Sequence, residues 1–302
     1  EQPRLGDSET SRVLTGLAWC RRKQERYVEA ARHYQRWLDT FPKDPQRPTV
    51  ALVLAETQWL LGEEDEAIAL YRLVADWKPA ASETPAALLA LARHQRRTQT
   101  REQAEATLRR LIAEFPQFRQ LEDALYEQAW LLAELERRDL AERAWRRLVA
   151  EFPQGRFAAD ACYRLACLAE RRGDAADARH WIARLAKTQT DEKSDLRQHA
   201  LHLEARLLAN EGAWEEIADR MSALSQQAGR VDVRLATDYW VAEGLFQRAR
   251  YREAAERLQR LENELSETGD ADRAATESSP SVEPSASDDE WRVQVSRRRA
   301  ES

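Results

Sequence analysis

The chain has 302 residues, of which 43% are hydrophobic and 33% charged, so it is able to bury a core and is not disordered throughout. Its 47 basic and 53 acidic residues leave a net charge of -6, so the chain has no overall positive electrostatic potential that would attract nucleic acid. Only nine Gly and ten Pro interrupt a sequence rich in helix formers, and no apolar run reaches the roughly 18 residues of a membrane span. We therefore expect an all-α chain with no integral membrane segment and no nucleic-acid partner.

Small residues recur along the chain at an interval of 37 residues, which indicates an internal repeat. Within a unit, apolar residues fall at helical spacing on both sides of a short break, so each unit is predicted to be a pair of helices. Small side chains at the recurring positions allow the paired backbones to approach closely. The two alanine series are Ala18, Ala55, Ala92, Ala129 and Ala166, and Ala30, Ala67, Ala104, Ala141 and Ala178; a proline series, Pro42, Pro79, Pro116 and Pro153, closes the units.

The ends of the predicted helices carry the residues that such ends favour. Pro48 and Pro85 stand where a second and a third pair would begin, in the first turn, where a missing N–H costs little. Gly62, Gly173 and Gly212 can take the positive φ that ends a first helix. The register slips by two residues after the fifth unit and then resumes. We predict seven helix pairs, starting near Ser11, Pro48, Pro85, Glu122, Ala159, Gln198 and Leu235.

These boundaries divide the chain into three parts. Residues 1–10 form an N-terminal flank, and residues 11–264 form a helical solenoid. Residues 265–302 are rich in Ser, Glu, Asp, Ala and Pro and finish with Arg297, Arg298 and Arg299, so this segment is predicted to be a disordered tail with a basic end.

The fifth unit resembles the tetratricopeptide repeat, because it contains Phe152-Pro153, Ala158, Ala161, Tyr163, Leu165 and Ala166, followed by Gly173 and Ala178. The resemblance extends over about 250 of the 302 residues. The Phe-Pro ending and the interval of 37 are similar to the subtype of bacterial envelope proteins that includes the barrel-assembly lipoprotein and the Tol-Pal-associated constriction coordinator. The resemblance implies an α-α superhelix that is a non-catalytic scaffold, binds a protein or peptide segment in its concave groove, and works in the bacterial cell envelope or periplasm.

Residues that would carry catalysis or hold a cofactor are not recognisable in the sequence. It has no Gly-rich phosphate loop, nucleophile elbow or Cys-His pair, so we predict no enzyme activity and no cofactor. His199 and His202 are three residues apart with Glu204 nearby, but two imidazoles without a third ligand at useful spacing do not predict a metal site. The three cysteines, Cys20, Cys162 and Cys167, lie within helical patterns and are interpreted as reduced thiols.

The candidate binding residues lie on the first helix of each pair. Positions three before, one after and four after the packing alanine share one helix face, which we expect to line the groove. Aromatic residues and Arg are enriched among binding hot spots. The groove residues predicted in this way, with Arg97 beside them, are Trp19, Glu56, Trp59, Arg93, Arg96, Arg97, Tyr126, Trp130, Tyr163, Glu170, His202, Arg206, Tyr239 and Glu243.

Three other interpretations stay open at this point. Any single aromatic residue of the groove could equally pack between neighbouring repeats. The chain could also be the helical arm of a larger enzyme or of an envelope-assembly protein. Finally, it could be a structural homo-oligomer.

Overall fold

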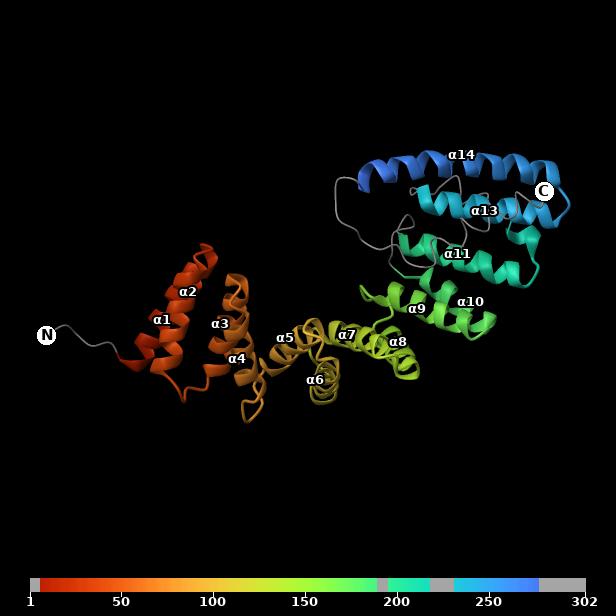
Figure 1. The fold of residues 1–302 in the computed structure, drawn as a ribbon. Coiled ribbons are helices and arrows are strands. Elements are labelled where there is room, and N and C mark those ends of the chain that lie inside the picture. Colours follow the sequence, from red (N-terminus) through yellow and green to blue (C-terminus); the bar gives the residue numbers. More distant parts are fainter. Residues whose placement is uncertain (1–5, 189–194, 218–230, 277–302) are drawn as a thin grey trace. The chain divides into compact units, whose positions relative to one another are not determined.

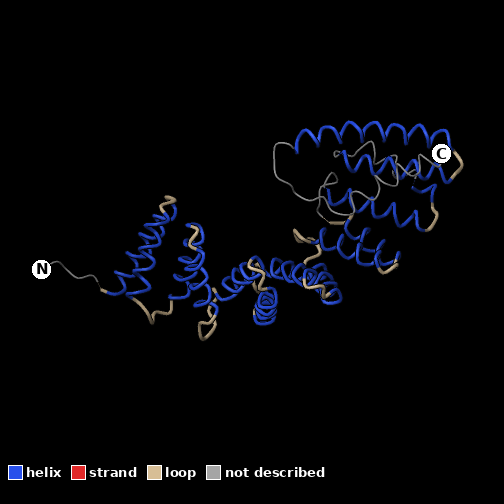
Figure 2. The backbone as a smooth tube through the Cα atoms, in the orientation of Figure 1, coloured by secondary structure: helices blue, strands red, loops and turns tan. Residues whose placement is uncertain are grey.

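A computed structural model describes residues 6–188, 195–217 and 231–276. Helices account for most of these residues and no strand occurs among them (Figure 2). The fold is the tetratricopeptide-type solenoid that the repeat predicts. The chain forms two compact units, residues 1–151 and residues 152–302.

The first unit contains four helix pairs (Figure 1). Each helix packs against the next one along the chain. The packing alanines Ala18, Ala55 and Ala129 have no solvent exposure, as expected where two backbones approach closely. The helices are α1 (Asp7–Lys23), α2 (Tyr27–Thr40), α3 (Arg47–Leu61), α4 (Glu64–Ala75), α5 (Thr84–Arg97), α6 (Arg101–Glu114), α7 (Leu121–Glu134) and α8 (Arg138–Glu151).

The second unit continues the same pattern. Its alanines Ala166, Ala205 and Ala242 are fully buried. The second helix of the sixth pair starts at Trp214 and passes at residue 218 out of the range that the structure describes. The helices of this unit are α9 (Ala158–Arg171), α10 (Ala175–Leu185), α11 (Asp195–Asn210), α13 (Val231–Gln247) and α14 (Tyr251–Thr276).

Local signals place most helix ends within a few residues of the prediction. Pro48 and Pro85 lie in the first turn of α3 and α5. Gly62 has φ of 82° directly after α3, and its N–H donates to the carbonyl of Trp59, so it caps the helix as expected.

Two boundaries differ from the prediction. The first helix begins at Asp7, four residues before Ser11, because the Gly6 N–H donates to the Glu9 carboxylate there at 2.9 Å, which satisfies the backbone at the start of the helix. The last helix continues past Glu264 to Thr276, which corrects the expected start of the tail. A helix that is already nucleated gains one backbone hydrogen bond for each residue that it adds, so it can propagate into such a polar segment. The rest of the predicted tail, 277–302, lies outside the described residues.

Buried rings complete the core of the first unit. Trp37 has no solvent exposure, and its indole N–H donates to the hydroxyl of Ser11 at 2.8 Å, which joins α2 to α1. Trp145 of α8 is only 2% exposed. Among the helices that the structure describes, none is both long and apolar enough to cross a membrane.

Candidate partner-binding face

Side chains at the predicted offsets of α1 and α3 lie on one exposed face, which we call the first-helix face. Trp19 stands one residue after Ala18 and is 56% exposed, whereas Trp59 stands four residues after Ala55 and is 38% exposed. Positions one and four residues after the alanine are three residues apart, so they lie on the same side of their helices. Both tryptophans therefore present part of a large ring to solvent.

A cation lies over each of these exposed rings. The Lys23 ammonium is 5.6 Å from the centre of the Trp19 ring, and the Arg97 guanidinium is 5.1 Å from that of Trp59. The His94 ring meets the Trp59 ring edge-on at 6.3 Å. Cation–π contacts of this kind hold a ring in place without removing it from water.

Ion pairs join consecutive repeats along the same face. Arg22 of α1 donates to Glu56 of α3 at 2.8 Å. Arg97 at the end of α5 pairs with Glu64 at the start of α4, and this contact lowers the pKa of Glu64. Glu56 and Arg97, both predicted to bind a partner, thus already form ion pairs within the chain.

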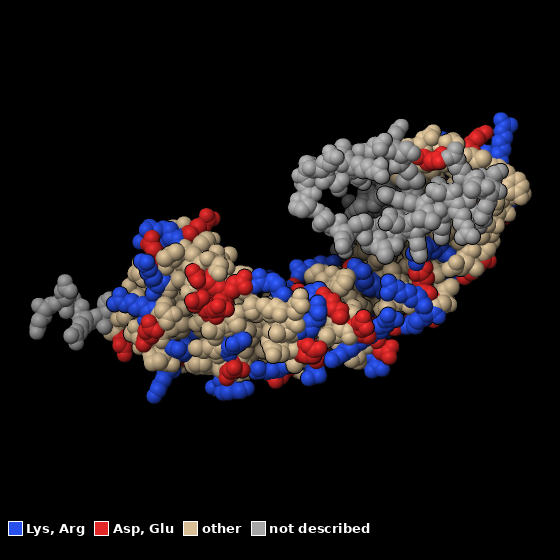
Figure 3. Space-filling model, viewed as in Figure 1, with Lys and Arg blue, Asp and Glu red and all other residues tan. Residues whose placement is uncertain are grey.

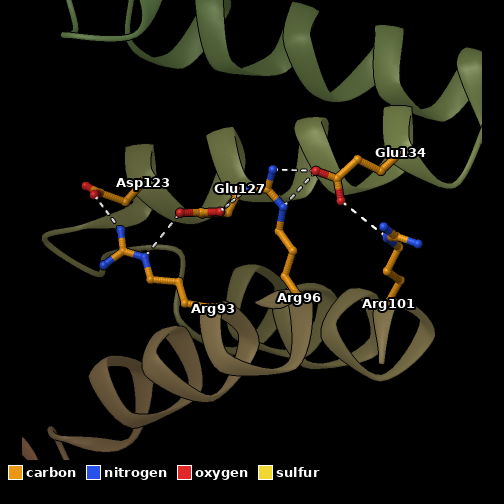
Figure 4. A network of polar contacts seen from close by, with 6 residues as sticks. All are labelled: Arg93, Arg96, Arg101, Asp123, Glu127 and Glu134. Atoms are coloured by element: carbon orange, nitrogen blue, oxygen red, sulfur yellow. Dashed lines mark hydrogen bonds and ion pairs between the residues drawn. The ribbon is translucent and has the colours of Figure 1, made fainter. Parts of the chain in front are cut away.

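A polar network connects α5 and α6 to α7 (Figure 4). Arg93 donates to Asp123 at 3.0 Å and to Glu127 at 3.2 Å. The remaining contacts are those of Arg96 with Glu127 at 2.9 Å, Arg96 with Glu134, and Arg101 with Glu134 at 3.5 Å.

Charge within this network is balanced, since three guanidinium groups face three carboxylates. The hydrogen bonds to Glu134 and Glu127 raise the pKa of Arg96, and the Arg96 guanidinium lowers the pKa of Glu134. A carboxylate from a partner would have to compete with these internal ones for Arg93 and Arg96. The network therefore fixes the junction between repeats rather than presenting a free anion site.

Tyr126 and Trp130 of α7 belong to an aromatic cluster with the buried Trp145. The ring centres of Trp130 and Trp145 are 5.9 Å apart, and those of Tyr126 and Trp145 are 5.5 Å apart. Tyr126 and Trp130 also meet edge-on at 6.4 Å. Both predicted groove rings are half-buried, so they help to pack α7 against α8.

The second unit has its own inter-repeat pair and ring contacts. Arg206 of α11 donates to Glu170 of α9, with 2.8 Å between Nε and Oε1. Tyr163 lies beside His199 with ring centres 6.2 Å apart, and His202 lies 6.0 Å from Trp240. Burial lowers the pKa of His202 to about 4, so this imidazole is neutral near pH 7.

Two predicted groove residues of α13 lie in the interior instead. Tyr239 is 4% exposed and packs in a cluster with Leu258 and Leu261 of α14. Glu243 is 5% exposed and accepts a hydrogen bond from Gln247 at 2.8 Å. Their helix position matches that of groove residues, but neighbouring helices cover them, so they do not form part of an accessible face.

The carboxylates that pair with the predicted arginines were missed by the sequence reasoning. They are Glu64, Asp123, Glu127 and Glu134. A signal for one of them exists, because Glu127 follows Arg93 by 34 residues, the interval that also separates Arg22 from its partner Glu56. The rule that an acidic residue stands 34 residues after an arginine, three fewer than the repeat of 37, would have predicted these pairs.

Groups able to hold a metal are not found in the described ranges, where no set of three or more His, Cys, Asp or Glu is suitably placed. Cys20 is exposed, whereas Cys162 is buried, and burial raises the pKa of the Cys162 thiol to about 11. A reactive thiol needs the opposite shift, so Cys162 is a packing residue rather than a nucleophile.

Models of the tetratricopeptide repeat match residues 86–117 and 123–155, and a further model of this repeat matches residues 5–45. The chain contains tetratricopeptide repeats. The matched ranges cover the network between α5 and α7 and the exposed Trp19, so both features lie within tetratricopeptide repeats. This repeat generally serves as a non-catalytic protein-interaction scaffold.

Solved structures similar to the chain are also repeat proteins. A tetratricopeptide repeat protein from Parabacteroides merdae is 15% identical, with a TM-score of 0.51, and the match covers 84% of this chain and 93% of that one. MamA from Desulfovibrio magneticus is 15% identical (TM-score 0.47; 61% and 96% covered), and PilW, a type IV pilus biogenesis factor, is 18% identical (TM-score 0.45; 74% and 94% covered). At these identities the first likeness shows the fold alone. No curated protein matches the chain in sequence.

Proposed function

We propose that the chain is a scaffold that holds a segment of a partner protein on its first-helix face, with Trp19 and Trp59 as the anchoring rings. The observation that carries this proposal is the exposure of both tryptophans at equivalent faces of consecutive repeats. Large rings are costly to leave in water and are the side chains most enriched in binding hot spots. A partner segment that crosses α1 and α3 would cover both.

The chemistry of the face favours an apolar segment flanked by an acidic residue. An apolar side chain of the partner would cover an indole, while its carboxylate would lie near Lys23 or Arg97, the cations over the two rings. Arg97 and Glu64 are 53% and 42% exposed, and water screens an exposed pair of this kind so that it adds little to stability. A partner carboxylate could therefore replace Glu64 at small cost, in contrast to the balanced network around Arg96.

Bulk charge gives this surface no preference for a polyanion. Basic and acidic side chains alternate over the part of the surface coloured in Figure 3, without a wide area of one sign. Recognition would then depend on the two rings and their local cations.

The test is a pull-down from the source cell with the intact chain, followed by a binding isotherm with the identified partner. Trp59→Ala should weaken binding by about 2 kcal/mol, or roughly 30-fold, while helicity is retained. Leu140→Ala is the matched control, because Leu140 is 44% exposed but lies on the second helix α8. Unchanged affinity of both Trp59→Ala and Trp19→Ala would refute the proposed face.

A second variant separates binding from packing. Trp130 contacts Trp145, so Trp130→Ala should lower the melting temperature more than Trp59→Ala does. If instead Trp130→Ala leaves stability unchanged and abolishes binding, the binding segment lies further along the chain, on α7.

A further inference from the structure

The outer face of α1 exposes apolar side chains at positions that later repeats bury. Val13 and Leu17, five residues and one residue before the packing alanine Ala18, are 46% and 40% exposed. Cys20, two residues after Ala18, is also exposed. Together they occupy positions i, i+4 and i+7, so they form one stripe along the helix, which we call the α1 stripe.

Equivalent residues of later repeats are interior. The position of Val13 is taken by Val50 in α3 and by Ala87 in α5, which are 5% and 0% exposed. The position of Leu17 is taken by Leu54 and by Leu91, which are 0% and 6% exposed. Helix α3 packs against α2, and α5 packs against α4, so the preceding helix pair lies against this side of the repeat.

The second unit shows directly what this position contacts. Val241 stands one residue before Ala242, as Leu17 stands before Ala18. It is 3% exposed and packs in a cluster with Leu208 and Ile217 of the preceding pair. The α1 stripe therefore resembles one half of a repeat-to-repeat interface, and its side chains are exposed among the described residues.

Gly16 lies within the same surface and leaves room for a close neighbour. A Cβ added there would meet no atom of the described residues within 4 Å. Glycine is unfavourable inside a helix, and nothing in the described part of the chain approaches this position closely enough to require it. A second helix crossing α1 at Gly16 would use the space.

We propose that the α1 stripe binds the α1 stripe of a second copy of this chain, with the two helices antiparallel. The charges at the ends of α1 select this orientation, because Asp7 and Glu9 lie in the first turn whereas Arg21, Arg22 and Lys23 lie in the last turn. Antiparallel pairing sets each acidic end beside a basic end, and it also opposes the two helix dipoles. Parallel pairing would bring like charges together.

Head-to-tail pairing with α14, the last helix that the structure describes, finds no matching apolar surface at these positions. In α2 and α4 the positions one and eight residues after the packing alanine are buried and apolar, as Ile68 and Ala75 show. In α14 the same positions hold Ala255, which is exposed, and Glu262. A surface that pairs with itself forms a closed dimer, and it needs no second patch.

The symmetry of such a dimer predicts which residues face each other. With the twofold axis between Gly16 and Leu17, Val13 lies opposite the partner's Cys20, and Gly16 lies opposite the partner's Leu17. Cys20 itself does not meet its own copy in this register.

Light scattering on the full chain between about 1 and 100 µM tests the dimer. The mass should rise with concentration from that of one 34.9 kDa chain to twice that value. Leu17→Glu should hold the mass at one chain with unchanged helicity, whereas Leu60→Glu, at a 55% exposed leucine of α3, should leave the dimer intact. A monomeric wild-type chain throughout this range, or a dimer that survives Leu17→Glu, would overturn the proposal.

A disulfide test checks the register and does not depend on a charged substitution. Val13→Cys should form a covalent dimer through the partner's Cys20 under copper–phenanthroline, at least several-fold faster than the wild-type chain. Val28→Cys is the matched control, since Val28 is 52% exposed on α2, away from the stripe. Equal cross-linking of the two variants would show that the stripe is not the contact surface.

Discussion

The turn inside each helix pair sets one residue in the left-handed conformation, yet only three of these residues are glycines. Every such residue stands two positions before the start of a second helix. In chain order they are Glu25 (φ 60°), Gly62 (82°), Gln99 (59°), Glu136 (57°), Gly173 (76°), Gly212 (72°) and Ala249 (60°). The four that carry a side chain store strain that a glycine would relieve, and we predict that Gln99→Gly stabilises the protein.

The size of the effect follows from two opposing contributions. A non-glycine residue in the left-handed region costs about 1–2 kcal/mol. Glycine costs about 0.5–1 kcal/mol through the greater entropy of the unfolded chain. Gln99→Gly should therefore raise the free energy of unfolding by about 0.5–1 kcal/mol. Gly62→Ala should lower it by a similar amount, since a Cβ at Gly62 would meet no atom of the described residues within 4 Å and only the backbone contribution changes.

Urea unfolding followed by circular dichroism measures both changes. The midpoint should move up for Gln99→Gly and down for Gly62→Ala, with the slope of the transition unchanged in each case. The N–H of residue 99 donates to the carbonyl of Arg96, and the substitution preserves that hydrogen bond. If Gln99→Gly destabilises the chain as much as Gly62→Ala does, the left-handed strain does not control stability at these turns.

Two further predictions concern packing and charge in α7. Ala129→Leu should lower stability by about 1–3 kcal/mol, because Ala129 is fully buried between paired helices; Ala133→Leu, at an exposed position of the same helix, should change the melting temperature little. Glu134→Gln should reduce the loss in the free energy of unfolding that occurs when the pH is lowered. Arg96 holds the pKa of Glu134 below its unfolded value, so the contribution of this carboxylate is present above about pH 4.5 and is lost as pH falls through the lower folded value. An equal loss of stability on acidification in the wild type and in Glu134→Gln would contradict this assignment.

The repeat itself could be predicted because each packing alanine reflects a geometric requirement. Two backbones that approach closely exclude a large side chain, so the spacing of Ala18, Ala55 and Ala129 is enough to predict the helix pairs from the sequence alone. The end of the last helix could not be predicted in this way. Beyond Glu264 the sequence shows no repeated apolar position, and composition alone does not distinguish an extended helix from a tail.

The ion pairs of the binding face were harder to foresee than the helices that carry them. Offsets from the alanines group Arg93 and Arg96 on one face of α5. They do not predict which side chains of the next repeat lie opposite these arginines. That partner depends on the register between α5 and α7, where Asp123 and Glu127 come into reach. Arg93 and Arg96, which were predicted to bind a partner, thus already pair with carboxylates of the chain itself.

Equivalent positions of a repeat share a direction but do not share an environment. Trp19 and Glu243 both stand one residue after a packing alanine, yet Trp19 is 56% exposed and Glu243 is 5% exposed. Val13 and Val50 are the same residue at the same position, at 46% and 5%. Exposure is therefore set by the neighbouring helices, and the repeat period predicts it only where the neighbours are also equivalent. In α1 that equivalence fails while the apolar residues remain, which is why the α1 stripe, rather than the equivalent buried residues of α3 and α5, is expected to bind a second copy.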